Sequence, residues 1–253
     1  MTGMAGFAGL MGWRWLFLPD RPAAARFLSD DEKRAIAADL AAEAGARGAS
    51  GDFAAALRDR RTYILALVYF AFYSTQSVLL LWVPTLLRNA GAHDLQEIGW
   101  RDATVIVAGA VGMAAIGWSS DRLQERRWHL VGSGLVAGAA LAALPLAAHS
   151  PSATTLLLAV AAVGIFAYLA LFWTVPTVVF GAGARAGGIA LVSAIGASGS
   201  ALSPTFIGWT QTLTGSLFGS IAALAAAFVL SLALLAVYAP TPRRAASENL
   251  RSC

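Results

Sequence analysis

Four long stretches of this chain contain no Asp, Glu, Lys or Arg, and they constrain its fold more than any other feature. They are residues 62–87, 103–120, 128–184 and 186–242. A helix needs about 20 residues to cross the hydrocarbon core of a bilayer. The four stretches therefore have room for one, one, two and two spans. They predict an all-α, polytopic membrane protein with a six-helix transmembrane bundle.

The interruptions between these stretches place the individual spans. Charged, Gly-containing or Pro-containing segments separate them, and proline inside a span is tolerated where neighbouring helices satisfy the freed carbonyl groups. We expect spans at residues 62–87, 101–119, 128–148, 153–178, 186–209 and 216–239. The rest of the chain would form an apolar stub at residues 1–18, a cytosolic segment at 19–61 and a cytosolic tail at 240–253.

The composition argues against several other classes of protein. Only 13% of the residues are charged, against about a quarter in a soluble domain. The net charge of +4 does not indicate a nucleic-acid partner, because basic residues beside apolar spans usually set membrane topology and no nucleic-acid motif accompanies them. Cys253 is the only cysteine, so no disulfide can form within the chain.

The basic residues also predict the orientation of the bundle. With six spans, all Lys and Arg residues except Arg14, Arg88 and Arg101 fall on the side that holds the 19–61 segment and the tail. The positive-inside rule places that side, and both ends of the chain, in the cytoplasm. We therefore expect a multi-pass protein of the cell membrane.

The polar segment before the first span contains one predicted helix. Ser29 and Glu32 have the spacing of a capping box, with acidic residues in the first turn. The helix should run to about Ala44, because Gly45 and Gly48 follow. The region as a whole is interpreted as a solvated loop, and the alternative is a cytosolic helix that packs under the membrane domain.

The most specific local motif is Gly117–His129 (GWSSDRLQERRWH), at the cytosolic end of the second span. Its functional residues would be Gly117, Asp121, Arg122, Arg126 and Arg127. Glycine lets two helices approach closely, and an Asp that faces an Arg and a helix N-terminus can form a charged latch between parts that separate. The pattern resembles the loop motif of the major facilitator superfamily, which has a further Gly in the turn near Gln124. The alternative is that the arginines only set topology.

Further stretches resemble one branch of that superfamily, the anion:cation symporters, which carry organic anions such as sugar acids and tartrate. The stretches occur in the order expected for the C-terminal half: Leu81–Gly91, Gly117–His129, Phe172–Leu191 and Gly208–Ser216. Leu18–Lys33 is similar to the family's central cytosolic loop. The resemblance implies twelve helices in two six-helix halves, with substrate bound at the midplane between them.

Several residues are candidates for one side of a substrate site. Tyr69, Tyr73 and Gln76 share one face of the first span at spacings of four and seven. Their polar groups could bind a substrate hydroxyl or carboxylate, or the tyrosines could simply pack against other helices. Phe172 and Trp173 would add an apolar wall or belong to the core.

The fifth span has a row of small residues that favours close helix contact, namely Ser193, Ala197 and Ala201. The resemblance implies asparagines at the positions of Ser193 and Ala197. Ser193 is therefore a further candidate for substrate contact, with shorter polar reach than an amide.

No constellation for catalysis or cofactor binding is present, and we expect neither an enzyme nor a cofactor. His93, Asp94 and Glu97 could hold a metal ion weakly, but a solvated loop is the favoured interpretation and no metal is expected. We also expect no ionisable group inside the six spans, where proton coupling usually needs one, and His149 falls at a boundary. The resemblance places such groups, and the anion-binding arginine, mainly in the first half of the family's fold.

Near the N-terminus, GWRWLF (Gly12–Phe17) directly precedes LPDRP (Leu18–Pro22). In the resembled family these motifs lie on either side of the sixth span, which implies that this span is deleted here. The alternative is an apolar N-terminus that arose by chance. Residues 1–18 have no basic region before the apolar part and no small-residue cleavage site, so we do not interpret them as a signal peptide.

Three functions are compatible with these observations. The first is the C-terminal half of an organic-anion transporter, inactive without the N-terminal half. The second is a half-transporter that works as a homodimer or with a separately encoded N-terminal half. The third is a membrane protein that does not transport and acts through interactions. The expected partners are the lipid bilayer, a small organic anion in the first two cases, and no nucleic acid.

Overall fold

The structure is a computed structural model that describes residues 29–46, 56–180 and 185–238. The chain divides into two compact units, residues 1–50 and 51–253. The predicted stub at 1–18, the motifs around Phe17 and Leu18, and the predicted tail at 240–253 lie outside the described residues.

The described part of the first unit is the helix α2, Asp30–Ala46. Ser29 and Glu32 form the predicted capping box. The Glu32 amide donates to Ser29 Oγ at 3.3 Å, and the Ser29 amide donates to the Glu32 carboxylate at 2.9 Å. The Ser29 amide and hydroxyl both donate to the Glu32 carboxylate, and these two hydrogen bonds lower the pKa of Glu32 below its usual value. The predicted helix is confirmed, and it ends two residues later than expected.

The second unit is built from helices, and the part of it that the structure describes contains no strand. They are α4 (Arg60–Leu81), α5 (Val83–Asn89), α6 (Leu95–Leu123), α7 (Arg127–Ala142), the 3-10 helix η2 (Leu144–Ala147), α8 (Pro151–Phe172), α9 (Thr174–Val179), α10 (Arg185–Thr214) and α11 (Leu217–Tyr238). This confirms the predicted all-α fold.

Proline explains why three of the expected spans are each divided into two helices. Pro84, Pro145 and Pro176 cannot donate a hydrogen bond to the carbonyl four residues earlier, and α4, α7 and α8 end within four residues before them. Pro204 differs, because α10 continues through it. Each of the six expected spans therefore has a helical counterpart, but only three are single uninterrupted helices.

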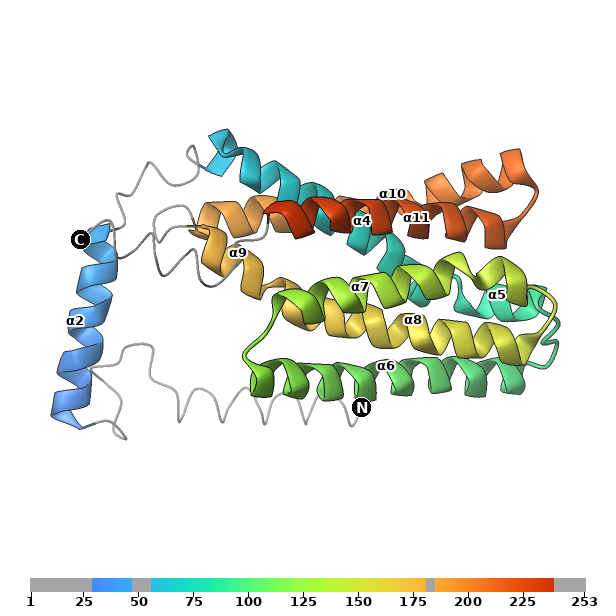
Figure 1. Cartoon of the computed structure of the whole chain (residues 1–253), viewed down its shortest axis with the longest axis horizontal. Helices are drawn as coiled ribbons and strands as arrows, with labels where there is room; N and C mark the ends of the chain where they lie inside the picture. The colour runs from blue at the N-terminus through green and yellow to red at the C-terminus, as the bar shows by residue number, and fades with distance from the viewer. Residues whose placement is uncertain (1–28, 47–55, 181–184, 239–253) are drawn as a thin grey trace, which may run out of the picture. The chain divides into compact units, whose positions relative to one another are not determined.

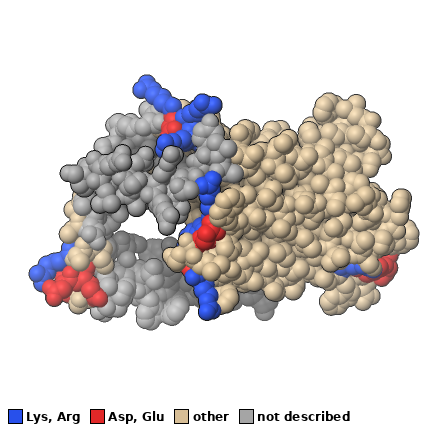
Figure 2. Space-filling model, in the orientation of Figure 1, with Lys and Arg blue, Asp and Glu red and all other residues tan. Residues whose placement is uncertain are grey.

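Five segments of the described chain are long and apolar enough to cross a membrane: α4, α6, α10, most of α11, and α8 with the start of α9. The third expected span corresponds to α7 and η2 together. On the face of the second unit shown in Figure 2, charged side chains lie at its two ends, and the broad band between them is uncharged. This distribution is what a bilayer-spanning bundle requires.

The second span begins earlier than the sequence predicts. We expected it at residues 101–119, but α6 starts at Leu95, because Asp94 caps its first turn by accepting a hydrogen bond from the Glu97 amide at 3.1 Å. The helix therefore adds Glu97 to Arg101 and Asp102, which already stand at the start of the expected span, and all three lie near the end where α6 begins. The expectation that this chain brings no ionisable group into a spanning helix is wrong for α6.

The main helices of the six expected spans pack in the order α6, α8, α7, α11, α4, α10 (Figure 1). Most elements lie between two neighbours, but α6 packs mainly on α8, and α10 mainly on α4 with less contact to α11. Only 17% of the apolar part of α6 and 28% of that of α10 are buried, against 50–56% for the other spans. The bundle is therefore open between α6 and α10.

Two glycines bring α10 close to α4. A Cβ atom on Gly196 would overlap the Tyr69 ring, and one on Gly199 would overlap the Phe70 carbonyl oxygen. The small residues expected to make this contact, Ala197 and Ala201, are exposed instead. The helix α10 does pack closely, but the predicted row of small residues is wrong for this contact, which uses Gly196 and Gly199 on the neighbouring face.

Candidate functional site

Four predicted site residues meet in one aromatic cluster. The Tyr69 and Tyr73 rings on α4 lie 4.7 Å apart, measured between ring centroids. Tyr69 stacks on Phe172 at the end of α8 at 4.3 Å, and its centroid lies 5.0 Å from that of Trp173. The spacing of four on α4 puts both tyrosines on one face, and the break at Trp173 turns the chain beside them. We call these four residues the tyrosine cluster.

The tyrosine cluster combines a packed interior with a polar edge. Tyr69 and Phe172 are buried, whereas Tyr73 and Trp173 are partly exposed. The Tyr69 hydroxyl makes no hydrogen bond to any described residue although it is buried. A buried hydroxyl without a partner is costly, and a ligand group can satisfy it.

A cavity of about 320 Å³ lies beside the cluster, and we call it the α4 cavity. Its wall comes from α4, α6, α8 and α10: Tyr73, Gln76, Ser77, Leu79, Leu80, Ile106, Phe166 and Ser200. Two predicted residues, Tyr73 and Gln76, thus line it together. Because α6 and α10 both contribute, the cavity lies on the open side of the bundle.

The polar groups of the α4 cavity differ in what they can offer a ligand. The Ser77 hydroxyl is already engaged, since it donates to the Ser74 carbonyl at 2.7 Å and pairs with the Ser203 hydroxyl. The Tyr73 hydroxyl and the Gln76 amide remain as the donors of the predicted set. The cavity can therefore hydrogen-bond an oxygen-rich ligand, but none of its described lining residues is charged.

The structure does not bring Ser193 to this site. Its hydroxyl donates to the Ile189 carbonyl of its own helix at 2.7 Å, and Ser193 is not part of the cavity wall. The wall also excludes Tyr69, Phe172 and Trp173. The Tyr69 ring contacts that of Tyr73, and Phe172 and Trp173 contact Tyr69.

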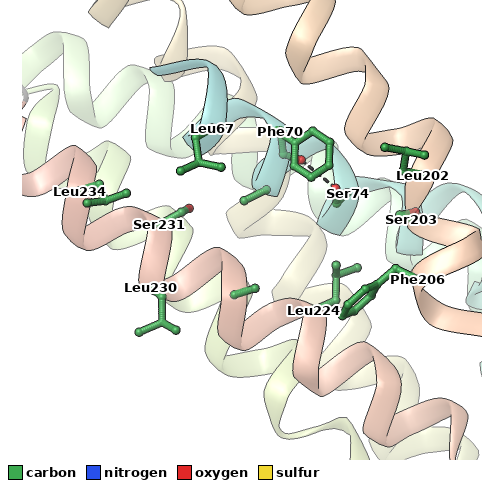
Figure 3. Close-up of a pocket in the computed structure, with 12 residues that line it drawn as sticks. Leu67, Phe70, Ser74, Leu202, Ser203, Phe206, Leu224, Leu230, Ser231 and Leu234 are labelled. Carbon is green, nitrogen blue, oxygen red and sulfur yellow. Dashed lines mark hydrogen bonds between the residues drawn. The ribbon is translucent and has the colours of Figure 1, made fainter. Parts of the chain in front are cut away.

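A larger cavity, of about 580 Å³, lies between α4, α10 and α11 (Figure 3). Its lining is apolar apart from Ser74, Ser203 and Ser231. Ser74 donates to Phe70 and Gly199 carbonyls, Ser203 pairs with Ser77, and Ser231 donates to the Phe228 carbonyl. With these hydroxyls engaged, the cavity offers an anion no free donor, and none of the predicted site residues lines it.

Two residues of the predicted latch pair with each other at the turn between α6 and α7. Asp121 and Arg126 form an exposed ion pair at 3.1 Å. Arg122 instead lies over the Trp118 ring at 5.3 Å, and Arg127 over the Trp128 ring at 5.6 Å. A Cβ atom on Gly117 would meet nothing within 4 Å, so within the described residues this glycine does not permit a close helix contact.

Gln124 closes this turn in a conformation that favours glycine. Its φ of 50° is the one positive value among the described non-glycine residues. The Gln124 side chain donates to the Asp121 carbonyl at 2.7 Å, and the Ser120 hydroxyl donates to the Glu125 carbonyl at 2.9 Å. The left-handed turn therefore forms at the position near which the resembled family has glycine.

A hydrogen-bonded chain that the sequence analysis missed supports the same turn. The Glu125 carboxylate lies 3.0 Å from His129 Nδ1, and His129 Nε2 lies 3.2 Å from the Ser119 hydroxyl. Burial by itself raises the pKa of Glu125, but hydrogen bonds from the Trp128 amide and from His129 outweigh it and lower the pKa. The spacing of four residues between Glu125 and His129 is the sequence feature that could have indicated this contact.

At the opposite end of the bundle, a polar group joins α6 to α8. Arg101 forms an ion pair with Glu97 at 2.8 Å and lies 3.3 Å from the Thr155 hydroxyl. The weak metal site considered for His93, Asp94 and Glu97 does not form, because Asp94 caps α6 and Glu97 pairs with Arg101. No group of three or more metal-binding side chains occurs in the described parts of the chain.

Comparisons with known proteins agree with this architecture. The sequence profile of the Major Facilitator Superfamily matches residues 1–204. Two proteins of Agrobacterium vitis, provisionally named tartrate transporters, are 34% and 33% identical over 97% and 96% of this chain. The provisionally named metabolite transport protein NicT of Pseudomonas putida is 30% identical over 88% of it.

The chain aligns with only part of each of these relatives. The chain spans 60%, 58% and 55% of their respective lengths. The all-helical bundle, the profile match over most of the chain and the identity to named transporters lead to one conclusion: this chain belongs to the Major Facilitator Superfamily.

Proposed function

We propose that the bundle serves as one six-helix half of a secondary transporter for small organic anions and works only with a second half. The α4 cavity is the observation that carries this proposal. It places the Tyr73 hydroxyl and the Gln76 amide on the open side of the bundle, where a second half would complete the enclosure. The names of the relatives, which include tartrate transporters, support the choice of anion class.

The substrate would meet this half through hydrogen bonds. Tyr73 and Gln76 would donate to carboxylate or hydroxyl oxygens, and the buried Tyr69 hydroxyl could become available if the cluster rearranges. Phe172 and Trp173 would hold the tyrosines in place. Since no described residue of the cavity wall is cationic, the second half would supply the charge that neutralises the anion, as the family resemblance implies.

The exposed sides of α6 and α10 support the need for a partner. Both helices are apolar along their length yet much less buried than the other spans. A second half could be a separate polypeptide or a second copy of this chain. In either case we propose that Asp121, Arg122, Arg126 and Arg127 form the cytosolic latch against it, with Gly117 allowing its approach.

Uptake into membrane vesicles tests this function. Vesicles that contain only this chain should take up labelled tartrate no faster than empty controls. Vesicles that also contain the N-terminal half of an A. vitis relative should take it up several-fold faster, and Gln76→Ala should return this uptake to the rate of the empty controls. Uptake by the chain alone as a monomer would contradict the proposal, whereas uptake by a cross-linkable dimer would favour the second copy as partner.

A further inference from the structure

Asp102 is a carboxylate on a membrane-spanning helix that the proposed function does not use. It lies on the packed side of α6, four residues after Ile98 and three before Val105, both of which are buried. Its Oδ1 atom is fully buried and accepts no hydrogen bond from any residue that the structure describes. The residue as a whole stays partly exposed, so water can reach the rest of its carboxyl group.

The neighbouring arginine does not satisfy this carboxylate. The Arg101 guanidinium is engaged by Glu97 at 2.8 Å, by Thr155 at 3.3 Å and by Ser152 at 3.5 Å. These partners hold it against the start of α8, and no hydrogen bond joins it to Asp102 Oδ1.

Other charged groups near this end of α6 do not compensate Asp102 either. Of the two elements that pack there, α5 carries Arg88, whose side chain is exposed, and α8 contains no Asp, Glu, Lys, Arg or His. The loop before α6 carries His93 and Asp94, which are both exposed. The remaining charge on this part of α6 is Glu97, which has the same sign as Asp102.

A carboxylate in this position is compensated most simply by a proton. An ionised carboxylate needs hydrogen-bond donors or a paired cation when it is buried, and its cost is highest in a membrane. Protonation removes the charge and gives the group a donor of its own. We propose that Asp102 is a proton-binding site. A carboxylate oxygen takes one proton from a hydronium ion, so that one O–H bond forms as another breaks and water is left, and the reverse step returns the proton to water.

The position of Asp102 suggests how a bound proton would be used. Ile106, one helical turn further along α6, lines the α4 cavity. Asp102 therefore lies one turn beyond the cavity, towards the end of the bundle where α6 begins. Its use as the coupling proton rests on the proposed function, but proton binding itself can be measured on this chain alone.

Infrared spectroscopy of the full chain in liposomes tests the proposal. At neutral pH the wild-type protein should show the carbonyl stretch of one protonated carboxyl group, with the usual shift to lower frequency in heavy water. Asp102→Asn should abolish this band. Asp94→Asn, which removes an exposed carboxylate before the same helix and keeps a residue that can cap it, should leave it unchanged.

Two results would overturn proton binding: no such band in the wild type at neutral pH, or a band that persists in Asp102→Asn. If Asp102→Asn does not fold, Asp102→Glu should keep the band at a shifted frequency, and its loss would count against the proposal. The measurement needs neither substrate nor second half, so failure of the uptake experiment leaves this result standing.

Discussion

Gln124 shows at the residue scale how this chain departs from the family it belongs to. The turn between α6 and α7 requires a left-handed residue, and the resembled motif has glycine near this point. Here a glutamine adopts φ 50°, a conformation that costs an L-residue roughly 1–2 kcal/mol. Its own side chain offsets part of this cost through the bond to the Asp121 carbonyl.

We expect Gln124→Gly to raise the free energy of unfolding by up to about 1 kcal/mol, because relief of the strained φ exceeds the loss of one exposed hydrogen bond. Gln124→Ala should lower it by about 1 kcal/mol, because alanine keeps the strain and loses the bond. Thermal unfolding of both variants in the same detergent measures the difference. Equal melting temperatures for the two would show that the turn is not strained.

Glu125 gives the same turn a dependence on pH. Its pKa in the folded protein is lowered from the usual 4.5, so its stabilising contribution is present above that value and is lost as the pH falls below it. Glu125→Gln should therefore be less stable than wild type at neutral pH, and this difference should shrink under acid conditions. Melting temperatures compared across that range check the prediction. A constant difference would mean that ionisation of Glu125 plays no part.

At the scale of secondary-structure elements, α10 illustrates that a helix can be predicted more readily than its contacts. Small residues occur all around it, and several rows at spacing four are compatible with close packing. The row through Ser193, Ala197 and Ala201 was the obvious choice in the sequence. The α4 contact is made instead by Gly196 and Gly199, where the Tyr69 ring and the Phe70 carbonyl leave no space for a side chain.

We expect Gly199→Ala to destabilise the bundle by about 1–3 kcal/mol, since the added Cβ would overlap backbone atoms of α4 that cannot move aside easily. Gly208→Ala on the same helix is the matched control. Nothing lies within 4 Å of its Cβ position, and alanine favours helix over glycine, so it should be neutral or slightly stabilising. Thermal unfolding compares the two, and similar losses would contradict the predicted α4–α10 contact.

At the scale of the whole molecule, the predicted topology remains to be tested. The positive-inside rule places the α6–α7 turn in the cytoplasm and the α7–α8 loop outside. A phosphatase fused after Arg126 should therefore be inactive, and one fused after His149 should be active. The reverse pattern would invert the bundle and place both ends of the chain outside the cell.

The sequence by itself determined the membrane class, the all-helical fold, the approximate spans and one polar face of α4. These features depend on local properties: apolar length, proline and glycine positions, and spacings within one helix. Tyr69 and Tyr73, for example, share a face because they lie four residues apart. The sequence indicated Phe172 and Trp173 only as an apolar wall or as core residues, and it did not predict their contact with Tyr69.

Only the tertiary structure decided which helices are neighbours, that α6 and α10 flank an open side, and that Ser193 lies outside the wall of the α4 cavity. It also decided that Asp102 buries an oxygen without a partner, although the sequence placed it at the edge of a span. The physical reason is that each of these properties depends on packing between segments far apart in the chain. Helical periodicity restricts the faces available for such packing, but several faces of an apolar helix satisfy it equally well.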